Sequence, residues 1–184
     1  MNKTLQKAVE LSKLIGNKNL TDVCEFGVHY GATVTQIRKL YPSFVPVFGF
    51  DTFTGLPEDW VGTCQPKGSA SCGGEIPNVP GVTFYKGLFK DTLLEYMKIA
   101  KPMILCHVDC DLYSSTKDVL YTLNHMIQPG TVLCFDEWYY NFEDIEQNRQ
   151  HEQKCFYEWV EEKNRKYLLL DEIEVERKIV LITE

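Results

Sequence analysis

The chain has 184 residues, a length that suits one compact domain with a sizeable hydrophobic core. Hydrophobic residues make up 44% and charged residues 24% of it, a balance that excludes disordered, collagenous and membrane-embedded classes. The formal net charge is −7 and Lys and Arg do not cluster, so nucleic acid is not an expected partner. Apolar stretches fall well short of the ~20 residues that cross a bilayer, and the first residues have no signal-like apolar run. We therefore expect a cytoplasmic protein that does not enter a membrane.

Predicted helices and strands alternate along the chain. The helices have apolar residues at helical spacing and end at Gly or Pro, whereas the strands are short apolar runs. In chain order the predictions are a helix over 5–15, a strand over 23–26, a helix over 32–40, a strand over 45–50, a strand over 82–85, a helix over 91–100, a strand over 103–108, a helix opened by a capping box at 115–118, a strand over 131–135, a helix around 155–160, and strands over 167–170 and 179–182. This alternation predicts an α/β fold with a parallel, doubly wound sheet.

Residues 52–80 form a long segment between two predicted strands. Glycines and prolines recur throughout it, which leaves no room for a regular helix or strand. Loops of this length inside a compact domain are usually functional, so we expect a lid or a substrate-binding loop within a single domain over 1–184. Cys64 and Cys72 lie in this loop, but their spacing fits no zinc knuckle, and we expect the seven cysteines to be reduced.

Polar residues follow four of the predicted strands. In a doubly wound sheet the ligand lies over the carboxyl ends of the strands, so these positions are the first place to look for function. They are Glu25, Gly27 and Gly31 near the first strand, Asp51 after the second, Asp109 and Asp111 after the fourth, and Asp136 and Glu137 after the fifth.

The first two strand ends indicate an adenosine-containing cofactor. Gly27 and Gly31 allow a tight turn close to a ligand, but His29 stands where the dinucleotide fingerprint has a glycine. Asp51 ends the second strand, where an acidic side chain accepts the hydroxyls of a ribose. The alternative is that Asp51 only caps the following turn.

The acidic residues after the fourth and fifth strands indicate a divalent cation. Neighbouring carboxylates repel one another unless a proton or a cation lies between them, and oxygen ligands suit Mg²⁺ or Ca²⁺. The alternative is that Asp109 and Asp111 point apart and Asp111 caps the next helix.

Several other side chains have two interpretations each. We expect His107 to be a packed core histidine rather than a ligand, whereas His29 is either a cofactor contact or a bystander. Trp60 and the aromatic residues at 138–140 form either a wall for a sugar or phenol ring or ordinary packing under a lid.

Four motifs occur in one order along the chain: EFGVHYG at 25–31, GFDTFTGLP at 49–57, HVDCDLYSST at 107–116 and FDE at 135–137. Together they closely resemble the macrocin O-methyltransferase family of class I S-adenosylmethionine-dependent enzymes. The resemblance extends over nearly the whole chain from about Val23.

This resemblance implies a Rossmann-like, seven-stranded, mostly parallel sheet whose last strand is antiparallel, with helices on both faces. It also implies an enzyme that uses Mg²⁺ to methylate a hydroxyl, often on the sugar of a natural product. The implied cofactor-binding residues are Glu25, Gly27 and Gly31 for the methionine part, Asp51 for the ribose, and Val28 and Thr52 beside them. The implied metal ligands are Asp109, Asp136 and Glu137, although the family often has a second Asp where Glu137 stands.

We therefore expect an O-methyltransferase that acts on a small molecule. Bound S-adenosylmethionine supplies the methyl group, a divalent cation lowers the pKa of the acceptor hydroxyl, and Asp109 takes the proton, with Asp111 and His29 as the next candidates. The alternatives are an NAD-dependent oxidoreductase and a cofactor-binding protein without turnover. The sequence identifies neither the methyl acceptor nor the oligomeric state, for which a homodimer is one option.

Overall fold

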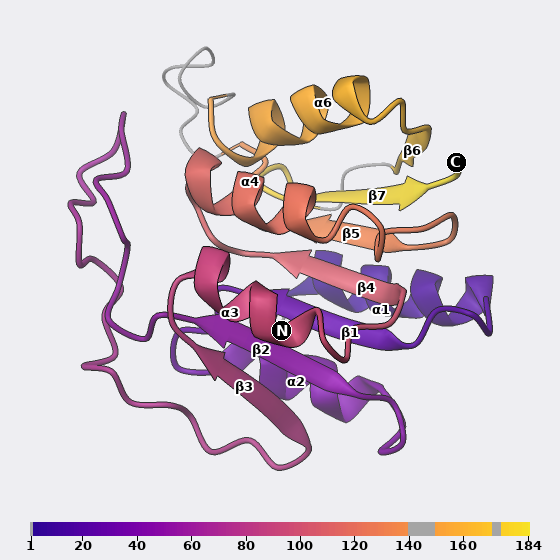
Figure 1. Ribbon diagram of the computed structural model, residues 1–184, viewed down its shortest axis with the longest axis horizontal. Helices are drawn as coiled ribbons and strands as arrows, with labels where there is room; N and C mark the ends of the chain where they lie inside the picture. The colour runs from indigo at the N-terminus through magenta and orange to yellow at the C-terminus, as the bar shows by residue number, and fades with distance from the viewer. Residues whose placement is uncertain (1, 140–149, 171–173) are drawn as a thin grey trace.

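A computed structural model describes residues 2–139, 150–170 and 174–184 (Figure 1). Within these residues seven strands form one sheet in the order β3-β2-β1-β4-β5-β7-β6. The strands are β1 (Asp22–Phe26), β2 (Val47–Asp51), β3 (Val82–Lys86), β4 (Met103–Val108), β5 (Val132–Phe135), β6 (Tyr167–Leu169) and β7 (Lys178–Ile182). The helices are α1 (Lys3–Ile15), α2 (Ala32–Leu40), α3 (Phe89–Tyr96), α4 (Tyr113–Thr122) and α6 (Glu152–Glu162).

Six strands run parallel and β7 runs against them. β1 pairs with β2 and β4 in parallel, β2 pairs with β3 and β4 with β5 in parallel, and β7 is antiparallel to both β5 and β6. In Figure 1 the arrow of β7 points away from the edge toward which β2 and β4 point. The parallel arrangement and the antiparallel last strand are both confirmed, and β7 lies between β5 and β6.

Helices cover both faces of the sheet (Figure 1). Leu5 of α1 and Ile37 of α2 belong to one buried apolar cluster. Leu93 of α3, Val119 of α4 and Phe156 of α6 belong to a second cluster. Alternate strand residues point to opposite faces, so each strand supplies side chains to both clusters. The central strands are therefore buried on both sides, which explains their continuous apolar sequence.

Two predicted helix starts differ from the structure. α3 begins at Phe89 and ends at Tyr96, so it is shifted toward the N-terminus relative to the prediction. The predicted capping box at 115–118 is wrong, because α4 already begins at Tyr113 after Leu112, which supplies no side-chain cap. Thr116 lies inside the helix and its hydroxyl donates to the carbonyl of Leu112 at 2.9 Å.

The loop over 52–80 contains no helix or strand, as predicted, but it is held by turns. The amides of Cys72 and Gly74 both donate to the carbonyl of Phe53, at 3.1 and 2.7 Å. Gly55 has a φ of 90°, and a Cβ there would lie 2.4 Å from the carbonyl oxygen of Gly68, so only glycine fits. Cys64 in this loop is exposed and both it and Cys72 are free thiols.

None of the helices in the described residues has the length and apolar character needed to cross a membrane.

Candidate functional site

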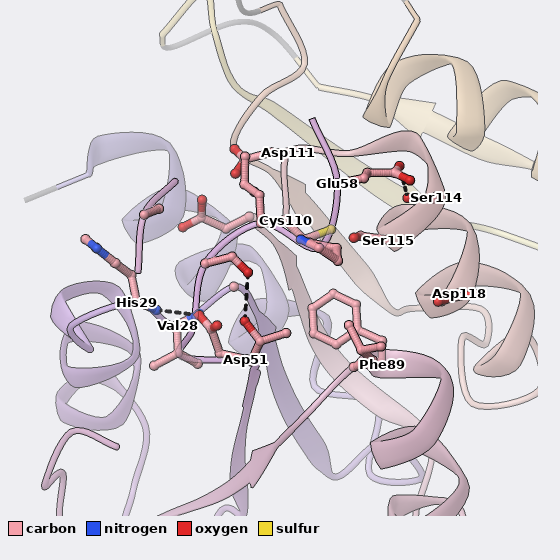
Figure 2. A pocket seen from close by; sticks show the side chains of 18 of the residues that line it. Val28, His29, Asp51, Glu58, Phe89, Cys110, Asp111, Ser114, Ser115 and Asp118 are labelled. Atoms are coloured by element: carbon pink, nitrogen blue, oxygen red, sulfur yellow. Dashed lines mark hydrogen bonds between the residues drawn. The ribbon is translucent and has the colours of Figure 1, made fainter. Parts of the chain in front are cut away.

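A cavity of about 570 Å³ lies over the carboxyl ends of β1, β2 and β4 (Figure 2). Its lining comes from the turns that follow these strands, from the start of α3, from the first turns of α4 and from the loop over 52–80. Among the residues predicted for cofactor binding, the cavity is lined by Gly27, Val28, Asp51 and Thr52. This is the location expected for a ligand in a doubly wound sheet.

The turn after β1 brings the backbone close to the neighbouring strand. Gly27 has a φ of 97°, and a Cβ there would lie 1.6 Å from the carbonyl oxygen of Asp109. No side chain fits at Gly27, so the backbone itself forms the wall of the cavity at this point. Gly31 also has a positive φ of 81° and precedes α2, but it does not line the cavity.

Asp51 ties two of these turns together. Its carboxylate accepts the amides of Val28 at 2.8 Å, His29 at 2.7 Å and Phe53 at 2.7 Å. A carboxylate has about four acceptor positions, so one is left for a ligand hydroxyl. The alternative role, capping the next turn, is therefore present, and the contact with a ribose stays a prediction.

Glu25 is placed differently from the prediction. Its side chain is fully buried and does not line the cavity. Glu25 and His107 are paired residues of β1 and β4, so their side chains lie on the same face of the sheet, and Oε1 of Glu25 is 2.9 Å from Nδ1 of His107. The contact between Glu25 and the methionine part of the cofactor therefore stays a prediction.

His107 links two acidic residues inside the sheet. Its Nε2 lies 3.7 Å from Oδ1 of Asp136, on the side away from Glu25. Burial alone lowers the pKa of His107, but the carboxylates of Asp136 and Glu25 outweigh it and raise the pKa well above its usual value. The predicted core histidine is confirmed as buried, and it is also an electrostatic partner of both carboxylates.

Asp109, Asp136 and Glu137 come together as the sequence predicts. Each offers one carboxylate oxygen within 4.8 Å of the others. Burial raises the pKa of Asp109 and of Glu137 well above the usual range, and the neighbouring carboxylates add to the effect. Oε2 of Glu137 is buried and has no hydrogen-bond partner among the described residues. This acidic triad and its unpartnered oxygen fit a divalent cation.

Asp136 has further partners that the sequence did not suggest. Arg177 donates to both of its oxygens, at 2.6 and 3.1 Å, and the side-chain amide of Asn2 donates to Oδ1 at 2.8 Å. Burial raises the pKa of Asp136, but His107 and Arg177 outweigh it and hold the pKa below its usual range. Asp136 is therefore ionised while its neighbours in the triad resist ionisation.

Asp111 lines the cavity, as Asp109 also does, but it does not belong to the acidic triad. Figure 2 shows it beside Cys110. Its φ of 66° is left-handed, which is unusual for a residue other than glycine. Burial, with the charges of Asp136 and Asp51, raises its pKa to about 7. Asp111 does not cap α4, because Leu112 occupies the N-cap position.

Two further acidic residues belong to this region and were missed by sequence reasoning. Glu58 lines the cavity, and its Oε1 accepts the hydroxyl of Ser114 on α4 at 2.6 Å (Figure 2). Glu152, the first residue of α6, is fully buried behind the turns that carry Asp111 and Glu137. Burial raises the pKa of Glu152, Asp111 adds to this, and the amide of Cys110 opposes it.

The aromatic residues pack rather than line the cavity. Trp60 is buried with its ring edge-on to His151, and Trp138 packs against Phe135 and Phe156. Neither tryptophan lines the cavity, so the proposed aromatic wall is wrong for them and the packing alternative is confirmed. Tyr139 does not line it either, and residue 140 lies outside the described residues.

Comparisons with known proteins agree with this geometry. The sequence model of the family described as macrocin O-methyltransferase matches residues 78–172, which are 95 of the 184 residues. A search of curated proteins gave no match.

Solved structures share the fold. The calicheamicin methyltransferase CalS11 has a TM-score of 0.70 and 20% identity, over 96% of this chain and 77% of that one. The O-methyltransferase NovP has a TM-score of 0.70 and 19% identity, over 98% and 79%. An O-methyltransferase from Bacillus cereus in complex with SAH has a TM-score of 0.63 and 16% identity, over 97% and 81%.

At these identities the structural likeness shows the fold alone, whereas the family match covers more than half of the chain. The chain belongs to the macrocin O-methyltransferase family and is a methyltransferase.

Proposed function

We propose that this enzyme transfers a methyl group from S-adenosylmethionine to a hydroxyl of a small molecule, such as a sugar or another natural product, with Mg²⁺ at the acidic triad. The observation that carries the proposal is the meeting of Asp109, Asp136 and Glu137 beside the cavity. Similar structures are consistent with it, since one is a TDP-rhamnose 3'-O-methyltransferase and another is an O-methyltransferase in complex with SAH. The family match argues against the oxidoreductase alternative.

The cavity suits the cofactor in size and in its walls. Its volume lies within the ~300–1,000 Å³ that is usual for ligand pockets. The bare backbone at Gly27 permits close approach, and Asp51 keeps one acceptor position for a hydroxyl. When bound, S-adenosylmethionine supplies an electrophilic methyl group, and the residues of this chain align it with the acceptor.

The acidic triad suits a divalent cation because its carboxylates are crowded and Oε2 of Glu137 lacks a partner. Asp109, Asp136 and Glu137 would hold the ion. A bound Mg²⁺ would lower the pKa of the acceptor hydroxyl.

The structure favours Asp111 over Asp109 as the proton acceptor. Both residues line the cavity, but Asp109 also belongs to the acidic triad, whereas Asp111 does not. A residue that holds the ion has its oxygens engaged, and a free carboxylate within reach of the hydroxyl can take the proton. His29 is exposed, which makes it the weaker candidate for the proton acceptor.

The test is a transfer assay with S-adenosylmethionine labelled in its methyl group and a panel of hydroxylated sugars and phenols. We expect Mg²⁺-dependent transfer that EDTA abolishes and that Glu137→Gln reduces strongly. Full transfer in EDTA would refute the role of the metal. Binding of SAH, measured by calorimetry with NAD as the comparison ligand, tests the cofactor independently of any acceptor.

A further inference from the structure

Three backbone amides converge on the buried carboxylate of Glu152. Its Oε1 accepts the amides of Cys110 and Asp111, each at 3.2 Å, and its Oε2 accepts the amide of Glu137 at 3.2 Å. The side chain is fully buried. Glu152 opens α6, yet none of these three amides belongs to its own helix, so the contacts are not an ordinary helix cap.

The three amides belong to two different turns. One turn follows β4 and carries Asp109 and Asp111, and the other follows β5 and carries Glu137. Within the sheet, β4 and β5 are paired up to Val108 and Phe135. The amide of Asp136 still donates to the carbonyl of Val108 at 2.9 Å, and the carboxylate of Glu152 joins the two segments directly after this last bond between them.

The turn after β4 also needs support because it is strained. Asp111 has a left-handed φ of 66°, a conformation that residues with a Cβ adopt infrequently. Such conformations persist only where surrounding contacts hold them. The hydrogen bond from the amide of Asp111 to Glu152 is such a contact, and it directs the Asp111 side chain toward the cavity.

We propose that Glu152 is a positioning residue that sets the spacing between Asp109, Asp111 and Glu137, and thereby the cation site and the proton acceptor. This inference rests on the proposed function. A carboxylate suits this place because both of its oxygens accept, whereas an amide would turn an NH₂ donor toward one of the backbone N–H groups. Substitution of Glu152 should therefore lower the affinity of the site for the metal, although Glu152 itself does not contact the metal.

The first test compares Glu152→Gln with a matched control. Glu158→Gln lies on the same helix and removes a carboxylate that accepts the Tyr113 hydroxyl but none of the three backbone amides. In calorimetry with Mn²⁺ alone, the affinity of Glu152→Gln for Mn²⁺ should be about 10–100-fold lower than that of wild type. This is the usual loss when a residue that supports the metal ligands is substituted. Glu158→Gln should bind both Mn²⁺ and SAH like wild type. Equal Mn²⁺ affinity in Glu152→Gln and wild type would overturn the proposal.

A second measurement separates this inference from the metal hypothesis. If wild-type protein fails to bind Mn²⁺, the metal part of the proposed function fails, and the positioning role is then judged by amide exchange. The amides of Cys110, Asp111 and Glu137 should exchange faster in Glu152→Gln than in Glu158→Gln, and unchanged exchange would overturn the role. Should Glu152→Gln not fold, Glu152→Asp keeps the charge on a shorter side chain and is judged by the same criteria.

Discussion

Asp109 and Asp111 are two residues apart, but the left-handed conformation of Asp111 gives them different surroundings. Both line the cavity, but only Asp109 lies with Asp136 and Glu137 in the acidic triad. We expect Asp111→Asn to lower kcat by about 10²–10⁴-fold, the usual effect of losing a general base, while Mn²⁺ affinity stays close to wild type. Asp109→Asn should lower both kcat and the affinity for Mn²⁺. Steady-state kinetics and calorimetry on the two variants check this, and a normal kcat in Asp111→Asn would return the role of base to another residue.

The same assignment fixes the direction of the pH dependence. The pKa of Asp111 is raised to about 7, and only its ionised form accepts a proton. The rate should therefore fall as the pH drops below about 7, and a bound cation should shift this fall to lower pH, because positive charge favours the carboxylate. The pH profile of kcat/KM at two Mg²⁺ concentrations measures both effects.

Asp51 stabilises two turns and also borders the cavity, so its substitution has two expected effects. Asp51→Ala leaves the amides of Val28, His29 and Phe53 without their acceptor and removes the predicted ribose contact. Hydrogen bonds to a charged acceptor contribute about 1.5–3 kcal/mol, so SAH affinity should fall by roughly 10–100-fold. Calorimetry with SAH measures this. Asp59→Ala is the control, because Asp59 accepts an amide of the same loop outside the cavity. Equal affinities in the two variants would remove Asp51 from the binding site.

At the scale of elements, the loop over 52–80 contacts the start of α4 at the cavity and also His151, which precedes α6 and does not line the cavity. Glu58 accepts the hydroxyl of Ser114 (Figure 2). Nε2 of His151 lies 3.0 Å from the carbonyl oxygen of Val61. We propose that this loop is a lid, because it borders the cavity and has few contacts of the kind that stabilise strands. SAH should slow proteolysis and amide exchange within 52–80, and Ser114→Ala should speed both in the free enzyme. Equal protection with and without SAH would argue for a purely structural loop.

Much of this arrangement was predictable because buried parallel strands have continuous apolar sequences and end at polar residues. That pattern located Asp51, Asp109, Asp136 and Glu137 at one edge of the sheet. The capping box failed because Leu112 and Tyr113 carry no local signal for a helix start, and the helix forms through packing instead.

Contacts between distant segments were not predictable from spacing. The pairing of Glu25 with His107 depends on the register of β1 against β4, and the bond from Arg177 to Asp136 depends on where the chain returns at β7. The buried position of Glu152, in contrast, could have been predicted from the sequence. Glu152 occupies the same helical stripe as Cys155, Phe156 and Trp159, and a charged residue at such a position must find buried partners.

At the scale of the whole molecule, the fold concentrates carboxylates at one edge of a sheet in a chain whose net charge is already −7. His107 and Arg177 are the cations that contact the acidic triad within the described residues, and both contact Asp136. Asp109 and Glu137 therefore keep raised pKa values. The folded state holds protons at these residues that the unfolded chain has already released.

This difference determines how stability depends on pH. Between about pH 4, where free carboxyls ionise, and pH 7, the folded state binds more protons at Asp109, Asp111 and Glu137 than the unfolded state does, so stability falls as pH rises. The raised pKa of His107 acts in the same direction, since its contribution is lost as pH rises through that pKa. The lowered pKa of Asp136 makes stability rise with pH instead, but only in more acidic solution.

We therefore expect the melting temperature in EDTA to fall from pH 5 to pH 8. Mg²⁺ binds the ionised carboxylates, so it should raise the melting temperature more at pH 8 than at pH 5. For a chain of this size about 1 kcal/mol corresponds to roughly 2–4 °C, which calorimetric scans resolve. Asp109→Asn should lose most of the Mg²⁺ effect at pH 8, whereas Glu158→Gln should keep it. An equal Mg²⁺ effect at both pH values, or one that survives Asp109→Asn, would show that the ion binds elsewhere.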